Sequence, residues 1–255
     1  MSPPPPPYPP RPASDAVNLR AVAPPGIVGG RIWRAGAGAS MDQSVAAELT
    51  AQHGLRAVID LRSASETARS GPPAALLEHG VRWFRAPLSG YPRAIVHVPR
   101  PTPDHYVRYY HAILMNSAAG DVRTLFGALA DAADEPFLVC CHLGKDRTAV
   151  AVAAVLGLIG VPDELIAADY AASGTALRPL VNRFAHKWRA HGWTRQDYLV
   201  HLDTPAVVMR TWLDQLRQRH GSVRAALLRA GARPDDLTAV TAALRAPPAS
   251  RIPPP

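Results

Sequence analysis

Residues 135–161 read EPFLVCCHLGKDRTAVAVAAVLGLIGV, and this stretch decides the fold. Its first part, Glu135–Cys141, is short and apolar, as expected of a strand that is buried on both faces. From Arg147 to about Ile159 the chain is apolar on every side, which predicts a buried helix, and Gly160 ends it. The polar residues CHLGKDRT lie between the two elements. The stretch therefore predicts a strand, a tight loop and a helix in immediate succession.

The rest of the chain repeats this alternation. Strand composition recurs at Leu55–Leu61 and Val81–Pro87, and a turn followed by a strand is expected within Ile27–Ala35. Apolar spacing predicts helices at about 43–53 (capped by Ser40), 103–116, 122–133, 178–191, 205–220, 222–230 and 234–245. This order favours an α/β domain with a central, mostly parallel sheet flanked by helices and a helix-rich C-terminal third. Ligands of such folds bind at the carboxyl ends of the strands, where the Cys141 loop falls.

Proline concentrates at the two ends of the chain, which has 27 prolines among 255 residues. Such segments cannot build a packed core, so we expect tails at 1–16 and 246–255 and a single domain at 17–245. The N-terminal tail could bind a partner that recognises proline-rich segments, although such tails more often act only as solubilising appendages.

The formal net charge is +8, and arginine carries nearly all of it, because Lys145 and Lys187 are the only lysines. The arginines are scattered and no nucleic-acid-binding motif occurs, so we expect no nucleic-acid partner. The apolar run Ala149–Val161 is too short to span a bilayer, and no signal peptide is recognisable. The only two cysteines, Cys140 and Cys141, are neighbours that point to opposite faces of a strand, so they cannot form an ordinary disulfide. We expect a cytoplasmic protein, with leaderless secretion left open.

The loop after the buried strand has the residues that chemistry on a phosphate monoester needs. Cys141 is a candidate nucleophile, and Arg147, six residues later, offers a planar fork to two phosphate oxygens. Gly144 permits the backbone conformation in which the loop's N–H groups converge on an anion, and these dipoles favour the thiolate. The hydroxyl of Thr148 can donate to the sulfur when it becomes the leaving group. The alternative is that Cys141 is only a small buried apolar residue.

The loop resembles the signature His-Cys-x-x-Gly-Lys-Asp-Arg-Thr-Gly of the bacterial tyrosine/serine protein phosphatases, which are related to dual-specificity and lipid phosphatases. Further stretches resemble this family in order: Val17-Asn18-Leu19-Arg20, Arg31-Ile32-Trp33-Arg34-Ala35, Ile59-Asp60-Leu61-Arg62 with Glu66, Asp169-Tyr170 with Ser173, Gly221-Ser222-Val223, and Asp236-Leu237. The resemblance covers nearly the whole chain between the tails, and it implies a protein-tyrosine-phosphatase-like fold.

By this resemblance Cys141 is the nucleophile, Arg147 binds the phosphate, Asp146 is the proposed general acid and Lys145 adds charge near the substrate. The backbone of His142, Leu143 and Gly144 would complete the phosphate site. Asp60, Arg62 and Arg34 are possible supporting residues; Asp60 is also a weaker acid candidate, as is Asp104, which is more simply a helix-start residue. The implied mechanism uses no metal and no cofactor.

The chain departs from the signature at several positions. The histidine before the nucleophile is Cys140, the small residue two positions after it is Leu143, and the final glycine is Ala149. Cys140 is either a buried strand residue, which we favour, or a redox partner of Cys141. The substrate is a phosphorylated protein or, alternatively, a small-molecule phosphate ester; a phosphate-binding protein with little turnover is the third interpretation. The basic and aromatic segment 183–193 is interpreted as an amphipathic helix packed on the core, with a substrate lid as the alternative.

Overall fold

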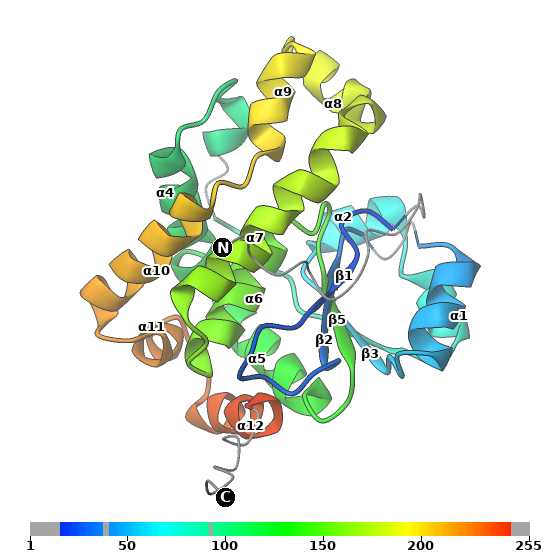
Figure 1. The fold of residues 1–255 in the computed structure, drawn as a ribbon, viewed down its shortest axis with the longest axis vertical. Coiled ribbons are helices and arrows are strands. Elements are labelled where there is room, and N and C mark those ends of the chain that lie inside the picture. Colours follow the sequence, from blue (N-terminus) through cyan, green and yellow to red (C-terminus); the bar gives the residue numbers. More distant parts are fainter. Residues whose placement is uncertain (1–15, 38–40, 92–93, 246–255) are drawn as a thin grey trace, which may run out of the picture.

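The computed structural model describes residues 16–37, 41–91 and 94–245 (Figure 1). Apart from Ala16, the predicted tails lie outside the described residues. Five strands form one sheet in the order β1-β2-β5-β3-β4: Arg20–Val22, Ile32–Ala35, Phe137–Cys140, Ala57–Asp60 and Arg82–Arg85. Strands β2, β5, β3 and β4 are parallel, and only β1 pairs antiparallel with its neighbour. The predicted α/β fold with a mostly parallel sheet is confirmed.

Successive residues of β5 point to opposite faces of the sheet, because the side chains of a strand alternate in direction. Leu138 and Cys140 face a smaller apolar cluster beneath α1 (Gln43–Ala51) and α3 (Ala74–Glu78). Phe137 and Val139 belong to the main core, which is covered by the helices on the other face. Figure 1 shows α1 on one side of the sheet and α5, α6 and α7 on the other. The central strand is thus buried on both faces, as its composition predicts.

Helix α6 (Asp146–Leu158) starts directly after the loop that follows β5. Every residue from Arg147 to Leu156 is buried, so the helix passes through the core of the molecule. Helices α4 (Pro103–Met115), α7 (Asp163–Leu177), α11 (Val223–Arg229) and α12 (Pro234–Leu244) pack against it. Further out lie α2 (Ala64–Ser70), α5 (Asp121–Ala132) and α10 (Ala206–His220). Among the described residues, no helix is both long and apolar enough to cross a membrane.

The structure corrects several predicted elements. Asp42, not Ser40, caps α1, because its carboxylate accepts from the N–H of Val45; Ser40 lies outside the described residues. The expected helix at 178–191 is a 3₁₀ helix, η3 (Arg178–Phe184), followed by the short α8 (Ala185–Ala190). Strand β1 and helices α3 and α9 (Arg195–Leu202) were not predicted. They are short, so their apolar spacing spans too few residues to be recognised.

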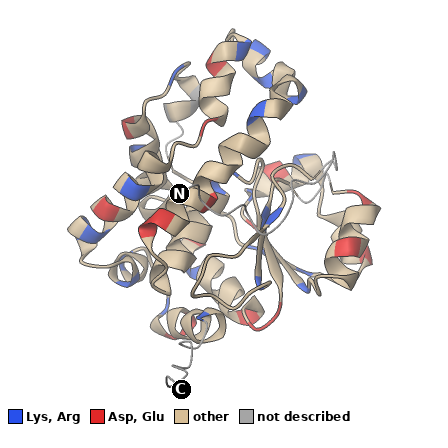
Figure 2. Ribbon diagram, in the orientation of Figure 1, with Lys and Arg blue, Asp and Glu red and all other residues tan. Residues whose placement is uncertain are grey.

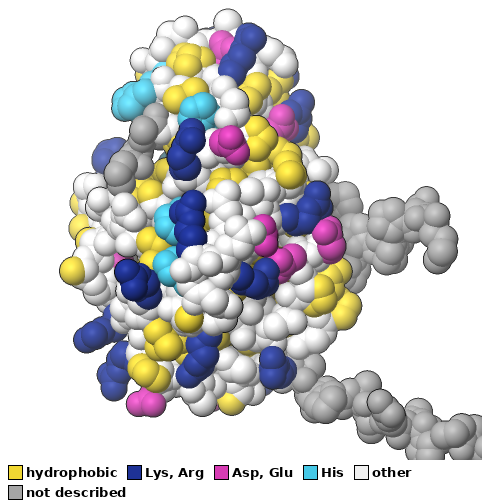
Figure 3. Space-filling view, turned by 90° about the vertical axis from the view of Figure 1, so that its left-hand side faces the viewer, with side chains coloured by type: hydrophobic (Ala, Val, Ile, Leu, Met, Phe, Trp, Pro, Cys, Tyr) yellow, Lys and Arg dark blue, Asp and Glu magenta, His cyan; other side chains and the backbone are white. Residues whose placement is uncertain are grey.

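Charged residues of both signs alternate over the surface. Figure 2 shows lysine and arginine on helices in all parts of the fold, with acidic residues between them. On the face in Figure 3, basic side chains are separated by other residues and form no continuous patch. On this face of the described residues, the basic side chains are therefore spread out rather than gathered into one binding surface.

Candidate active site

The loop 141–145 connects the central strand β5 to helix α6, and the carbonyl groups of residues 142–144 accept hydrogen bonds from other segments. The carbonyl of Gly144 accepts from Asn18 Nδ2 (2.9 Å) and from the guanidinium of Arg34 (2.7 Å). The carbonyl of His142 accepts from the N–H of Ala37 (3.1 Å). By contrast, the N–H groups of residues 142–147 donate no hydrogen bond within the described part of the chain. Unpaired N–H groups at the start of a helix, opposite bound carbonyls, form a site for an anion.

Gly144 makes this loop conformation possible. Its φ of +63° lies in the left-handed region, where side chains are disfavoured. It also packs against β2: a Cβ at this position would lie 2.4 Å from the carbonyl carbon and oxygen of Ala35 and 2.7 Å from the nitrogen of Gly36. Glycine is therefore required here both by the backbone angle and by the close approach of a second backbone.

Cys141 lines a pocket of about 160 Å³ and is only 3% exposed. Arg147 also lines this pocket, and Glu66 holds its guanidinium through two hydrogen bonds of 2.6 and 2.7 Å. The carbonyl of Leu61 accepts a third one, at 3.1 Å. Burial opposes the charge of Glu66, but hydrogen bonding and attraction from Arg147 outweigh it and lower the pKa of Glu66 to about 2. The carboxylate therefore fixes the arginine fork beside the thiol.

A buried network from the first strands supports the loop. Arg34 is fully buried and also contacts the carboxylate of Asp169, which in turn accepts from Arg20. Burial disfavours the charge of Asp169, yet Arg34 and Arg20 keep its pKa below the usual value. Arg20 additionally donates to Ser173 Oγ at 3.0 Å. The stretches 17–20, 31–35 and 169–173, which are far apart in the sequence and each resemble the family, thus meet at the carboxylate of Asp169.

The candidate acid Asp146 lines the pocket with Cys141, and a tyrosine and a lysine contact its carboxylate. Tyr110 donates its hydroxyl to Asp146 Oδ1 at 2.8 Å and contacts the hydroxyl of Tyr170 at the same distance. Lys145 Nζ lies 3.0 Å from Asp146 Oδ1 and 4.5 Å from the ring centroid of Tyr106. Burial opposes the charge of Lys145, but Asp146 raises its pKa. Lys145 is therefore a neutralising partner of Asp146.

The other predicted site residues divide into two groups. His142 and Leu143 line the pocket, whereas the buried hydroxyl of Thr148 has no hydrogen-bond partner within the described residues and so does not reach Cys141 Sγ in this state. Asp60 and Arg62 form a buried pair, with Arg62 Nε 2.9 Å and its NH2 nitrogen 2.7 Å from the carboxylate oxygens. Neither they nor the exposed Asp104 line this pocket. Asp60 therefore orients Arg62, which is a supporting role rather than that of an acid.

The two cysteines form no disulfide with each other, and they belong to different parts of the core. Cys140 packs in the cluster beneath α1, and Cys141 belongs to the main core on the opposite face of the sheet. This arrangement is the one expected of neighbours on a strand. It supports the interpretation of Cys140 as a buried strand residue.

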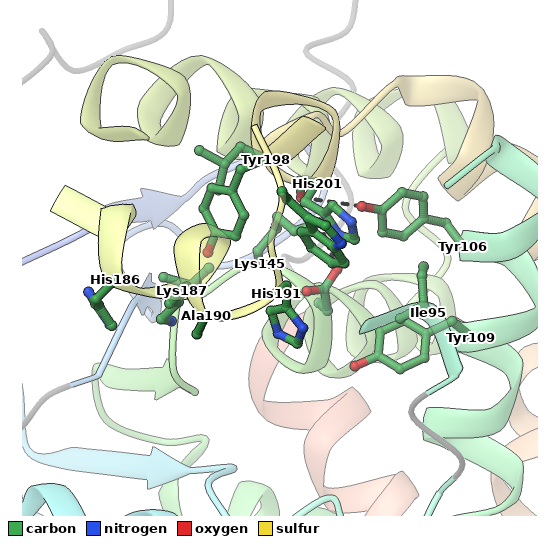
Figure 4. Close-up of a pocket in the computed structure, with 14 residues that line it drawn as sticks. Ile95, Tyr106, Tyr109, Lys145, His186, Lys187, Ala190, His191, Tyr198 and His201 are labelled. Atoms are coloured by element: carbon green, nitrogen blue, oxygen red, sulfur yellow. Dashed lines mark hydrogen bonds and ion pairs between the residues drawn. The ribbon is translucent and has the colours of Figure 1, made fainter. Parts of the chain in front are cut away.

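A second cavity of about 410 Å³ adjoins the first, and both share Tyr109, Leu143 and Asp146. Figure 4 shows Tyr106 and Tyr109 on one side of it and His186, Lys187 and Ala190 of α8 on the other. We call η3, α8 and α9 (Arg178–Leu202) the cap; its apolar side chains form a separate small cluster with Leu143. Phe184 is buried in this cluster and Trp188 and Trp193 pack against it, so the favoured interpretation of segment 183–193 as a helical segment packed on apolar side chains is supported, although α8 itself has no fully buried residue. The segment also lines the cavity.

Three features of the site escaped the sequence analysis. Glu66 resembles part of a family element in the sequence, but its contact with Arg147 was not predicted; it also forms a capping box with Ser63. Tyr106, Tyr109 and Tyr110 of α4 fit the spacing of an amphipathic helix, and the sequence did not indicate that they lie at the site. Lys187 contacts His142 across the mouth of the pocket. Its signals were the rarity of lysine in this chain and its place in the basic and aromatic segment 183–193.

Comparison with known families agrees with this geometry. A model of the tyrosine phosphatase family matches residues 16–246, nearly the whole chain. The protein therefore belongs to the tyrosine phosphatase family, a family of phosphoric monoester hydrolases. A search of curated proteins finds no match to the chain.

Proposed function

We propose that this phosphatase is cysteine-dependent, forms a cysteinyl-phosphate intermediate and acts on phosphotyrosine in proteins, with phosphoserine and phosphothreonine as possible further substrates. The observation that carries the proposal is the Cys141 loop, whose carbonyls are held outward while its N–H groups stay unpaired beside the thiol and Arg147. Such a loop offers dipoles to all three non-bridging oxygens of a phosphoryl group.

The proposed reaction has two displacements at phosphorus. In the first, the thiolate of Cys141 attacks phosphorus, the bond to the ester oxygen breaks, and the carboxylic acid of Asp146 gives its proton to the leaving alcohol or phenol. In the second, water attacks the phosphocysteine while Asp146 accepts a proton, and the P–S bond breaks to release phosphate and the thiolate. Arg147 and the loop N–H groups hold the equatorial oxygens throughout.

The walls of the two cavities support an aryl ester as the substrate. Tyr91 and Tyr109 line the catalytic pocket, and Tyr106, Trp193 and Tyr198 line the adjoining cavity. Aromatic walls favour a phenyl ring and an apolar neighbouring side chain through stacking. An inositol polyphosphate would need a wide basic site, whereas here Lys145 is already paired with Asp146. Phosphotyrosine therefore fits better than a polyanionic small molecule.

The test compares Cys141→Ser with Cys140→Ser, because both variants replace the same atom at adjacent positions. With p-nitrophenyl phosphate, Cys141→Ser should lower kcat by at least about 10³-fold, while Cys140→Ser should keep most of the activity. After rapid acid quenching, the wild type should carry phosphate on Cys141. A Cys141→Ser enzyme as fast as the wild type would refute the mechanism.

A substrate panel then separates the alternatives. Phosphotyrosine peptides should give the highest kcat/KM, above phosphoserine peptides, nucleoside monophosphates and inositol phosphates. A small-molecule phosphate that exceeds the peptides would support the second interpretation. Tight vanadate binding with negligible turnover of every ester would instead indicate a phosphate-binding protein.

A further inference from the structure

The charged side chains around Cys141 cancel one another before a substrate arrives. Arg147 and Lys145 supply two positive charges, and Glu66 and Asp146 supply two negative ones, in ion pairs of 2.6 and 3.0 Å. In the proposed first step Asp146 is protonated, so a thiolate and a phosphate dianion together with Glu66 outweigh Arg147 and Lys145 by two negative charges. Only the partial charges of the loop N–H groups would then oppose them. A further cation at the mouth of the pocket would reduce this excess of negative charge.

Lys187 is placed to supply this charge. It belongs to α8 of the cap, and its Nζ contacts Nε2 of His142, the residue directly after the nucleophile. His142 lines the catalytic pocket, and Lys187 lines the cavity that adjoins it (Figure 4). Both lysines of the chain thus border the same site, although they are 42 positions apart in the sequence (187 − 145). Unlike Lys145, Lys187 has no carboxylate partner within the described residues.

The present partner of Lys187 is weak enough to be exchanged. Burial and the charge of Lys187 lower the pKa of His142 to about 4, so its neutral ring accepts a hydrogen bond from the ammonium at pH 7. Burial lowers the pKa of Lys187 to about 8, while the negative charges of Cys141 and Glu66 counteract this shift. The ring of Phe184 lies 5.5 Å from Nζ, and His186 and His191 line the same cavity. A phosphate dianion is a stronger acceptor than any of these groups.

We propose that Lys187 is a further catalytic residue, whose ammonium leaves His142 and binds a non-bridging oxygen of the phosphoryl group. This role rests on the proposed phosphatase mechanism. It makes the cap part of the active site, because Lys187 belongs to α8. Leu143, which is bulkier than the family signature expects, packs in the cap cluster and gives the loop a fixed apolar contact with the same segment.

The experiment uses Lys187→Met, Lys187→Arg and the control Arg189→Met in the full-length protein. Arg189 is an exposed cation on the same helix, with its guanidinium over Trp188, so its removal changes the charge of the cap equally. We would measure kcat/KM for p-nitrophenyl phosphate from pH 5.5 to 9.5, orthovanadate affinity by calorimetry, and the melting temperature of each variant.

At pH 6.5, Lys187→Met should lose about 10- to 100-fold in both kcat/KM and vanadate affinity, the range expected for one charge-assisted hydrogen bond. Arg189→Met should match the wild type, and Lys187→Arg should recover most of the loss. Since the charged form binds phosphate, wild-type kcat/KM should fall as the pH rises through about 8. In Lys187→Arg this fall should shift to higher pH, because guanidinium stays charged.

Lys187→Met and Arg189→Met with equal rates and affinities would overturn the proposal. An unchanged alkaline fall in Lys187→Arg would also overturn it, because a merely structural lysine would not set the pH profile. If Lys187→Met unfolds, the profile of Lys187→Arg decides alone. A wild type without turnover would refute the proposed function, and vanadate affinity would then still test the contact made by Lys187.

Discussion

Replacing Gly144 by alanine places a methyl group where the loop lies directly on β2. The new Cβ would lie 2.4 Å from the carbonyl carbon and oxygen of Ala35, well inside normal contact distance, and those atoms belong to the central sheet. The left-handed φ of +63° costs a non-glycine residue about 1–2 kcal/mol, and forced overpacking adds about 1–3 kcal/mol. Gly144→Ala should therefore lower the free energy of unfolding by about 2–5 kcal/mol.

Gly54→Ala is the matched control. Gly54 has nearly the same φ, +66°, but the nearest atom to its Cβ would be Pro136 Cγ at 3.8 Å, an ordinary contact. This variant should lose only the conformational cost of about 1–2 kcal/mol and should stay active. The difference between the two variants isolates the contact between the loop and β2.

Urea unfolding followed by fluorescence gives the two free energies, and p-nitrophenyl phosphate turnover reports on the loop. Gly144→Ala should lose at least about 10²-fold in kcat/KM, because a loop displaced by about 1 Å no longer aims its N–H groups at the phosphate. Equal stability and equal activity of the two variants would refute the reasoning. The loop would then not be seated on the sheet as described.

Two further changes test the charged partners of the site. Glu66→Gln replaces one charged hydrogen-bond acceptor of Arg147 and should cost about 1–3 kcal/mol of stability at pH 7. Because its pKa is depressed, Glu66 stabilises the fold above pH 4.5, so the advantage of the wild type should vanish as the pH falls from 4.5 to about 2; an advantage that persists at pH 2 would contradict the assignment. Asp146→Asn should lower kcat for phenyl phosphate by about 10²-fold or more but affect p-nitrophenyl phosphate less, because p-nitrophenolate leaves without a proton. Equal losses on the two esters would exclude Asp146 as the acid.

The cap shows where sequence reasoning reaches its limit. Segment 183–193 has aromatic and basic residues at helical spacing, and this pattern is the same whether a helix packs on a core or covers a cavity. The structure shows that both apply: Trp188 and Trp193 pack against the apolar cluster of the cap, and the segment also lines the cavity beside the loop. Amphipathic spacing indicates that a helix has an apolar side, but not which other element meets that side.

What the sequence determined by itself is local. The strand Phe137–Cys140, the left-handed turn at Gly144 and the buried helix follow from neighbouring residues, and they place Cys141 and Arg147 in one loop. Only the tertiary structure decided which groups surround that loop. Glu66 lies 81 positions from Arg147, and Arg34 lies 110 positions from Gly144. Such pairs form only when separate elements pack together, and the spacing of residues along the chain does not indicate which elements pack together.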